Sequence, residues 1–199
     1  MAVGVTAQKI MVLAESYICE RGFNAFSFRH LAEAVGVRTA GVHYHFRTKE
    51  ELGAAVARDY RERFLEELPD PADPSIEPEQ MITDYVSAFR DTLEKKNRVC
   101  LFGMLAAEIE SLPPEVVNET RRFFELNVAW LEKVYARMKE NSGTPYNPHA
   151  EALSLIARVE GLMIVARAMN DTSLFDQVFS SANGNGILCA KNPADQTHT

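Results

Sequence analysis

The chain has 199 residues, of which 46% are hydrophobic and 25% charged, and its formal net charge is −7. These proportions are typical of a globular protein with one or two domains and argue against intrinsic disorder or a fibrous repeat. Taken as a whole, an acidic chain is also unfavourable for nucleic-acid binding, because affinity for phosphates comes largely from Lys and Arg.

Neither a membrane span nor a secretory signal is recognisable. The apolar runs fall far short of the roughly 18 residues that a membrane helix needs, so we expect a cytoplasmic protein with no membrane partner. The three cysteines, Cys19, Cys100 and Cys189, are far apart and odd in number, which does not suggest a disulfide framework. No paired Cys or His spacing and no glycine-rich phosphate loop suggests a metal or a cofactor.

Helical spacing of apolar residues recurs along the chain and strand patterns are nearly absent, so the expected fold class is all-α. Thr6, Ser27 and Thr48 are predicted helix N-caps. In the N-terminal part, helices are expected over about 7–21, 28–34, 38–44 and 49–68.

A proline-rich break over 69–74 separates this part from the rest of the chain. Further helices are expected over about 78–96, 99–111, 113–141, 148–169 and 174–181. From residue 183 the sequence is polar and rich in Asn and Gly. The expected organisation is therefore a helical head (1–50), a larger helical body (51–183) and a flexible tail (184–199).

Two short helices joined by a three-residue turn form the helix-turn-helix pattern. Gly36 stands at the centre of the turn, where a positive φ is expected and glycine accommodates it at little cost. Small residues on the second helix would let it approach a DNA groove closely, and its basic residues can donate hydrogen bonds to bases or phosphates. Its outward-facing residues are Arg38, Thr39, Ala40, Gly41 and His43.

The distribution of charge supports this interpretation. Residues 1–49 carry six Lys or Arg and three Glu, a net charge of +3, which leaves −10 for the remainder. A modestly basic head on an acidic body is compatible with DNA binding. The negative total charge, taken alone, would argue against it.

The segments 28–37 and 41–52 resemble the TetR family of bacterial transcriptional regulators. The specific part is Tyr44-His45-Phe46-Arg47-Thr48-Lys49-Glu50-Glu51-Leu52, which matches the family pattern closing the recognition helix and opening the fourth helix. The resemblance covers about the first quarter of the chain. Gly41 is a departure, because many relatives have a bulkier or polar residue at this point.

The resemblance implies a role for each matching position on double-stranded operator DNA. Bases would be contacted by Arg38, Ala40, Gly41 and His43, with Thr39 beside them, and phosphates by Tyr44, His45 and Lys49. Ser27 and Arg29 would contact the DNA backbone. Ordinary solvated or capping roles remain open for the histidines and arginines, and a metal site from His43 and His45 alone is not expected.

Residues 150–169 are apolar around most of a helix, which therefore needs cover on two sides. Ala157, Gly161 and Val165 are spaced by four and form a face of mostly small residues that suits a two-fold axis. In the TetR family the last two long helices form such a homodimer interface, and the matching segments here are 150–169 and 174–181. A helix buried inside a monomer is the alternative.

Family members enclose a small-molecule effector in the helices between the proline break and the dimer helices. Candidate ligand-binding residues are Met104, Phe124, Trp130 and Met163, although such residues are more often plain core. The resemblance thus implies a repressor that an inducer releases from its operator.

Cys100 offers a second mode of control. The segment 99–108 resembles a TetR branch in which a cysteine senses oxidants or electrophiles. Arg98 and a helix N-terminus beside the thiol are expected to favour its thiolate, whereas the alternative is a small buried apolar side chain.

Two other classes of protein remain as alternatives. An all-α enzyme would use His43 and His45, or Glu108 and Glu110, but no nucleophile, base and orienting group are recognisable together, so no enzyme is expected. The second alternative is an architectural DNA-binding protein that binds no ligand.

Overall fold

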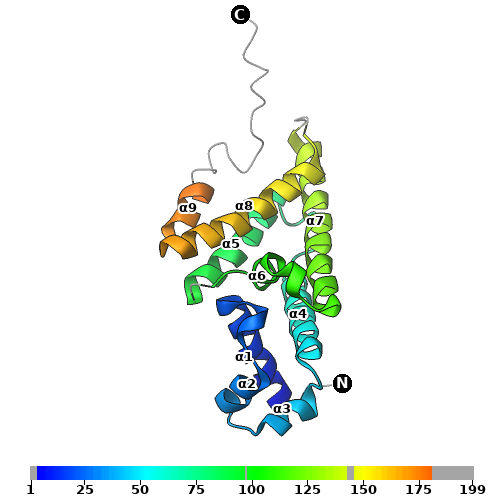
Figure 1. The fold of residues 1–199 in the computed structure, drawn as a ribbon. Coiled ribbons are helices and arrows are strands. Elements are labelled where there is room, and N and C mark those ends of the chain that lie inside the picture. Colours follow the sequence, from blue (N-terminus) through cyan, green and yellow to red (C-terminus); the bar gives the residue numbers. More distant parts are fainter. Residues whose placement is uncertain (1–3, 97, 143–145, 181–199) are drawn as a thin grey trace, which may run out of the picture.

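A computed structural model describes residues 4–96, 98–142 and 146–180, and within these ranges it contains helices and no strand. The all-α prediction is confirmed. Figure 1 shows a small head of short helices below a larger body, joined by the long helix α4. The predicted tail, 184–199, and Cys189 lie outside the described residues.

The elements follow the predicted order. The head contains α1 (Val5–Arg21), the 3-10 turn η1 (Phe23–Ala25), α2 (Phe28–Val35) and α3 (Thr39–His45). The body follows with α4 (Lys49–Glu66), α5 (Pro78–Lys96), α6 (Leu101–Ala107), η2 (Ile109–Ser111), α7 (Pro114–Ser142), α8 (Pro148–Met169) and α9 (Ser173–Ser180).

Helix starts follow local capping chemistry. The Thr48 hydroxyl accepts a hydrogen bond from the Glu51 N–H at 3.2 Å, which confirms the predicted cap of α4. The Thr6 cap is wrong, because α1 begins at Val5, two residues earlier than predicted, and Gly4 is its N-cap without a side-chain bond. A helix whose first turn is exposed can be capped by water instead.

The head has its own small core. Ile10 and Ala14 of α1, Leu31 of α2 and Val42 of α3 have no exposed surface. Three short helices can bury a common centre only when each contributes a large apolar side chain, and α1, the longest, packs against both others.

Aromatic rings dominate the core of the body. Phe64 of α4 lies edge-on to Tyr85, Phe89 and Phe123, with ring centroids 5.4–5.9 Å apart. The Tyr85 hydroxyl donates to the buried Asn127 amide oxygen at 3.0 Å, which satisfies a polar group that would be costly to bury alone. The aromatic cluster thereby joins α4, α5 and α7 in one core. Helix α8 crosses α7 (Figure 1).

None of the helices in the described part of the chain is long and apolar enough to span a bilayer.

Candidate nucleic-acid interface

The turn between α2 and α3 is made by backbone hydrogen bonds. The Ser27 hydroxyl accepts from the His30 N–H at 3.3 Å and so caps α2, as predicted. Gly36 has φ 78° and ψ 32°, a left-handed conformation that favours glycine. The N–H groups of Gly36 and Val37 both donate to the Ala32 carbonyl, at 3.0 and 2.9 Å. The chain therefore turns directly from α2 into α3.

Helix α3 is held by its inner face. Val42 is fully buried, as is Leu31 of α2. The His43 ring lies edge-on to Phe28, with centroids 4.8 Å apart, and its Nδ1 is 3.2 Å from the Arg47 carbonyl. When Nδ1 donates to that carbonyl, Nε2 is the ring nitrogen left for a ligand.

The side chains on the outer face of α3 make few contacts with the rest of the head. Tyr44 is 86% exposed, with its ring edge-on to His45 at 5.1 Å. A Cβ at Gly41 would meet only Val37, at the ordinary contact distance of 3.6 Å, so the fold does not require glycine there. The other exposed residues of this face are Arg38, Thr39 and Ala40. Small residues flanked by an exposed aromatic ring and a cation suit close approach to a groove.

Two of the basic candidates have partners inside the chain. The Lys49 ammonium lies over the rings of Phe23 and Phe26, at 4.7 and 4.5 Å, and burial lowers its pKa. Lys49 must leave these rings to hold a phosphate. Arg29 pairs with Glu33 at 3.0 Å, but both side chains are largely exposed, and an exposed pair is weak enough for DNA to replace.

The described residues contain no group of three or more His, Cys, Asp or Glu side chains that could hold a metal ion.

The head is held to the body at the end of α1. Arg167 of α8 donates to the carbonyls of residues 19–20, at 3.1 and 2.5 Å. At the end of α6, the Glu108 carboxylate accepts from the Phe23 N–H at 3.0 Å. Gly22, with φ 87°, lies so close that a Cβ would overlap this carboxylate. The end of α1 is therefore in direct contact with α8 and with the end of α6.

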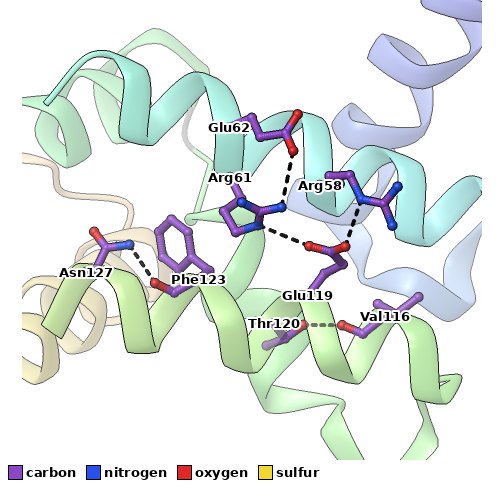
Figure 2. A network of polar contacts seen from close by, with 8 residues as sticks. All are labelled: Arg58, Arg61, Glu62, Val116, Glu119, Thr120, Phe123 and Asn127. Carbon is purple, nitrogen blue, oxygen red and sulfur yellow. Dashed lines mark hydrogen bonds and ion pairs between the residues drawn. The ribbon is translucent and has the colours of Figure 1, made fainter. Parts of the chain in front are cut away.

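Helix α4 is also held to α7 by a cluster of ion pairs (Figure 2). Arg58 and Arg61 donate through Nε to the two oxygens of Glu119 on α7, at 2.9 and 3.1 Å. Arg61 and Glu119 are only 15% and 14% exposed, so water screens their attraction less than on an open surface. Helix α4, which joins the head to the body, is thus fixed to α7 at Glu119.

The four residues predicted to bind a ligand lie on three helices, α6, α7 and α8. Met163 is fully buried, and Trp130 donates from Nε1 to the Pro69 carbonyl at 2.8 Å. Met104 and Phe124 are partly buried against the core. The cavity between head and body, of about 300 Å³, is lined by other residues. A ligand role for these four stays a prediction.

The expected activation of Cys100 is wrong. The side chain is 1% exposed, and burial raises the pKa of its thiol well above the ordinary value. Arg98 does not face it, but donates to Ser16 and Glu20 of α1. Because the thiolate is the reactive form, the thiol is held in its unreactive state, and the structure does not favour a cysteine sensor.

Together, the turn, the exposed outer face of α3 and the basic head define a helix-turn-helix DNA-binding protein. The family described as "Bacterial regulatory proteins, tetR family" matches residues 10–56. A TetR transcriptional regulator from Legionella pneumophila is 32% identical, with 92% of this chain and 98% of that chain covered and a TM-score of 0.81. The chain belongs to the TetR family and is a transcriptional regulator.

Two more distant relatives are informative. The HTH-type transcriptional repressor KstR2 of Mycolicibacterium smegmatis is 22% identical over 138 residues, which are 69% of this chain and 67% of that protein. The structure of AibR in complex with isovaleryl coenzyme A and operator DNA is 19% identical, covers 79% of this chain and 85% of that chain, and has a TM-score of 0.65. That structure shares the fold.

Proposed function

We propose that the protein is a homodimeric repressor that holds an operator through α3 and is released when a small-molecule inducer binds in the C-terminal helical body. Residues 1–50 act as the DNA-binding head and 51–183 as the regulatory body. The observation that carries the proposal is the outer face of α3, which is exposed, basic and not needed by the core of the head. The proposed contacts are Ser27, Arg29, Arg38, Thr39, Ala40, Gly41, His43, Tyr44, His45 and Lys49.

A second copy of the chain is the proposed partner of α8 and α9. These helices expose large apolar side chains that the core leaves uncovered: Leu153, Ile164, Val165, Met169 and Val178, which are 41–65% exposed. Ala157 and Gly161 on α8 are exposed as well. A contiguous apolar face of this kind is typical of an interface, and two heads related by a two-fold axis read two half-sites.

Control by a ligand is supported by the connection between head and body. The contacts of Arg167 and Glu108 with the end of α1 make the position of the head depend on α6 and α8. The AibR complex with isovaleryl coenzyme A and operator DNA supports only that a protein of this fold can bind both a small molecule and DNA. A ligand that prefers one arrangement of these helices would shift DNA affinity by the difference in its own affinity for the two arrangements.

DNA binding is tested on an operator selected from random duplexes, with fluorescence anisotropy as the readout. Replacing Tyr44 by Ala should weaken binding about tenfold, the effect of losing one hydrogen bond to a charged phosphate. The matched control is Arg121→Ala on the exposed surface of α7, which should bind as the wild type does. Equal loss in both variants, or none in either, would count against α3 as the interface.

The dimer is tested by sedimentation velocity. The wild type should sediment with twice the chain mass of 22.3 kDa, and Val165→Glu should sediment as a single chain, because a charge at the apolar interface remains unpaired. Val12→Glu on the exposed side of α1 is the control and should remain dimeric. A monomeric wild type, or a dimeric Val165→Glu variant, contradicts this interface.

A further inference from the structure

A cavity of about 300 Å³ lies where α1 of the head meets α4 and α5 of the body. Cys19, Tyr60 and Phe64 give it an apolar part, and Glu15, Arg63 and Arg98 are among the charged residues that line it. This volume is at the lower end of that found for small-molecule sites. The lining combines apolar side chains with charged ones from both head and body, which suits a ligand that has an apolar part and a charged group.

Arg98 is the most deeply placed cation of this cavity. Its side chain is 15% exposed, and Nη2 donates to the Ser16 hydroxyl and, at 2.5 Å, to the Glu20 carboxylate. Its Nε–H is buried and has no acceptor among the described residues. A ligand can reach this donor only when the guanidinium turns away from Glu20, and a buried donor without a partner favours an acceptor that comes with such a turn.

The second cation of the cavity also holds α1. Arg63 of α4 donates from Nη2 to Glu15 at 2.5 Å and from Nε to Asp59 at 2.9 Å. Arg63 and Arg98 thus bind two acidic residues on the same helix of the head. Together they form the junction clamp, in which Arg63 pairs with Glu15 and Arg98 pairs with Glu20.

The sign of the ligand charge follows from burial. The acidic groups of the cavity without a role in the clamp, Glu67 and Asp91, are exposed, so water already solvates them. Arg98, by contrast, is mostly buried and has an unused donor. A carboxylate or phosphate oxygen would gain a charge-assisted hydrogen bond there, whereas a cation would gain little from carboxylates that are already hydrated.

We propose that this junction cavity binds a small organic acid with an apolar body, whose acid group takes Arg98 from Glu20 while its apolar part lies against Tyr60 and Phe64. The proposal deepens the ligand-controlled repressor above and rests on it. When the ligand replaces Glu20 at Arg98, one half of the junction clamp opens and α1 loses a contact that fixes the head on the body.

Since α1 packs against both α2 and α3, this loss changes the position of the recognition helix. Ligand and operator then favour different arrangements of α1. By linkage, operator DNA must weaken binding of the acid by the same factor as the acid weakens binding of the operator.

The test uses the full-length protein and two sets of matched compounds in calorimetric titrations at neutral pH. One set is 4-phenylbutyrate, 4-phenylbutanamide and 4-phenylbutylamine, and the other is octanoate, octanamide and octylamine. Within a set the size is nearly constant and the charge changes from negative through zero to positive. In at least one set the acid should bind about tenfold more tightly than the amide, the effect of one charge-assisted hydrogen bond. Equal binding of acid and amide, tighter binding of the amine, or no binding by either acid would overturn the proposal.

Variants of Arg98 and Glu20 test whether the acid binds in this cavity. Arg98→Gln should weaken binding of the acid about tenfold, and Glu20→Gln should strengthen it, because the competing carboxylate is gone. Arg121→Gln removes an exposed charge of α7 outside the cavity and is the control. If Arg98→Gln is unstable, Glu20→Gln still decides the question, since unchanged or weaker binding in that variant contradicts competition at Arg98.

Anisotropy on the selected operator separates this inference from the proposed function. A protein that binds the operator but neither acid overturns the cavity assignment and leaves repression intact. A protein that binds an acid without any change in operator affinity supports the cavity and contradicts ligand control. Binding of the acid with weaker operator affinity supports both.

Discussion

Glu160 is a buried carboxylate in the middle of α8, and its ionisation should reduce the stability of the protein near neutral pH. Both of its oxygens are buried without a nitrogen or oxygen donor among the described residues, and the Cys100 thiol is the hydrogen-bonding group beside them. Burial raises the pKa from 4.5 to about 7, an effect that the nearby Cys100 thiol partly offsets. Gly103 makes room for the carboxylate, because a Cβ there would overlap it.

The sign and size of the effect follow from linkage. Because the pKa is higher in the folded chain, the folded state binds more protons, and stability falls as the pH rises from about 4.5 through 7. The displacement from 4.5 to about 7 corresponds to about 3 kcal/mol, at about 1.4 kcal/mol for each pH unit. Tyr60, Tyr85 and Cys100, which interact electrostatically with Glu160, all have raised pKa values and stay neutral throughout this range.

Urea unfolding of the wild type and Glu160→Gln between pH 5 and pH 8 measures the contribution of Glu160 to the free energy of unfolding. Other groups titrate alike in both proteins, so the difference in unfolding free energy isolates Glu160. We expect the variant to gain up to about 3 kcal/mol relative to the wild type over this range. Any constant effect of the amide cancels in the comparison. A difference that does not change with pH would refute the assignment of a buried carboxylate whose desolvation outweighs its contact with the Cys100 thiol.

Three further outcomes are expected. Gly22→Ala should destabilise the protein by more than Gly36→Ala, because residue 22 has φ 87° and ψ 169°, outside the left-handed helical region, and its new Cβ would also meet Glu108; backbone strain alone costs about 1–3 kcal/mol, and equal losses in thermal unfolding would contradict this expectation. In a Cys189→Ser background, Cys19 and Cys100 should react with a thiol reagent only on unfolding, since burial raises both pKa values; rapid labelling of the native protein would disprove this. Gly41→Leu should weaken operator binding while leaving the unfolding midpoint nearly unchanged, because the fold leaves space there; unaltered affinity would show that α3 does not approach DNA closely at this point.

The parts of the fold that sequence predicted are those set by local chemistry. Ser27 and Thr48 cap helices through a hydrogen bond to an N–H three residues away, and Gly36 forms a turn whose conformation depends on its own backbone. Such features are visible within a few residues of sequence. The outer face of α3 follows from the same local pattern.

The contacts between head and body depend on packing over long sequence distances. Arg98 and Glu20 are 78 residues apart, and Arg167 and the carbonyl of Cys19 are 148 apart. No local pattern identifies these pairs, although Arg167 and Glu160 are visible as charges on an otherwise apolar helix. Cys100 shows the converse error, because a neighbouring arginine in sequence does not determine which way its guanidinium turns.

The central claim is that a dimer of this protein reads two inverted half-sites with α3. It is tested most directly by selecting duplexes from a random pool and determining the mass of the complex on the enriched sequence by sedimentation. The account predicts a palindromic site with half-sites about one helical turn or more apart, with two chains or a multiple of two on each duplex. Failure to enrich any sequence, or a single chain bound to one half-site, would contradict it.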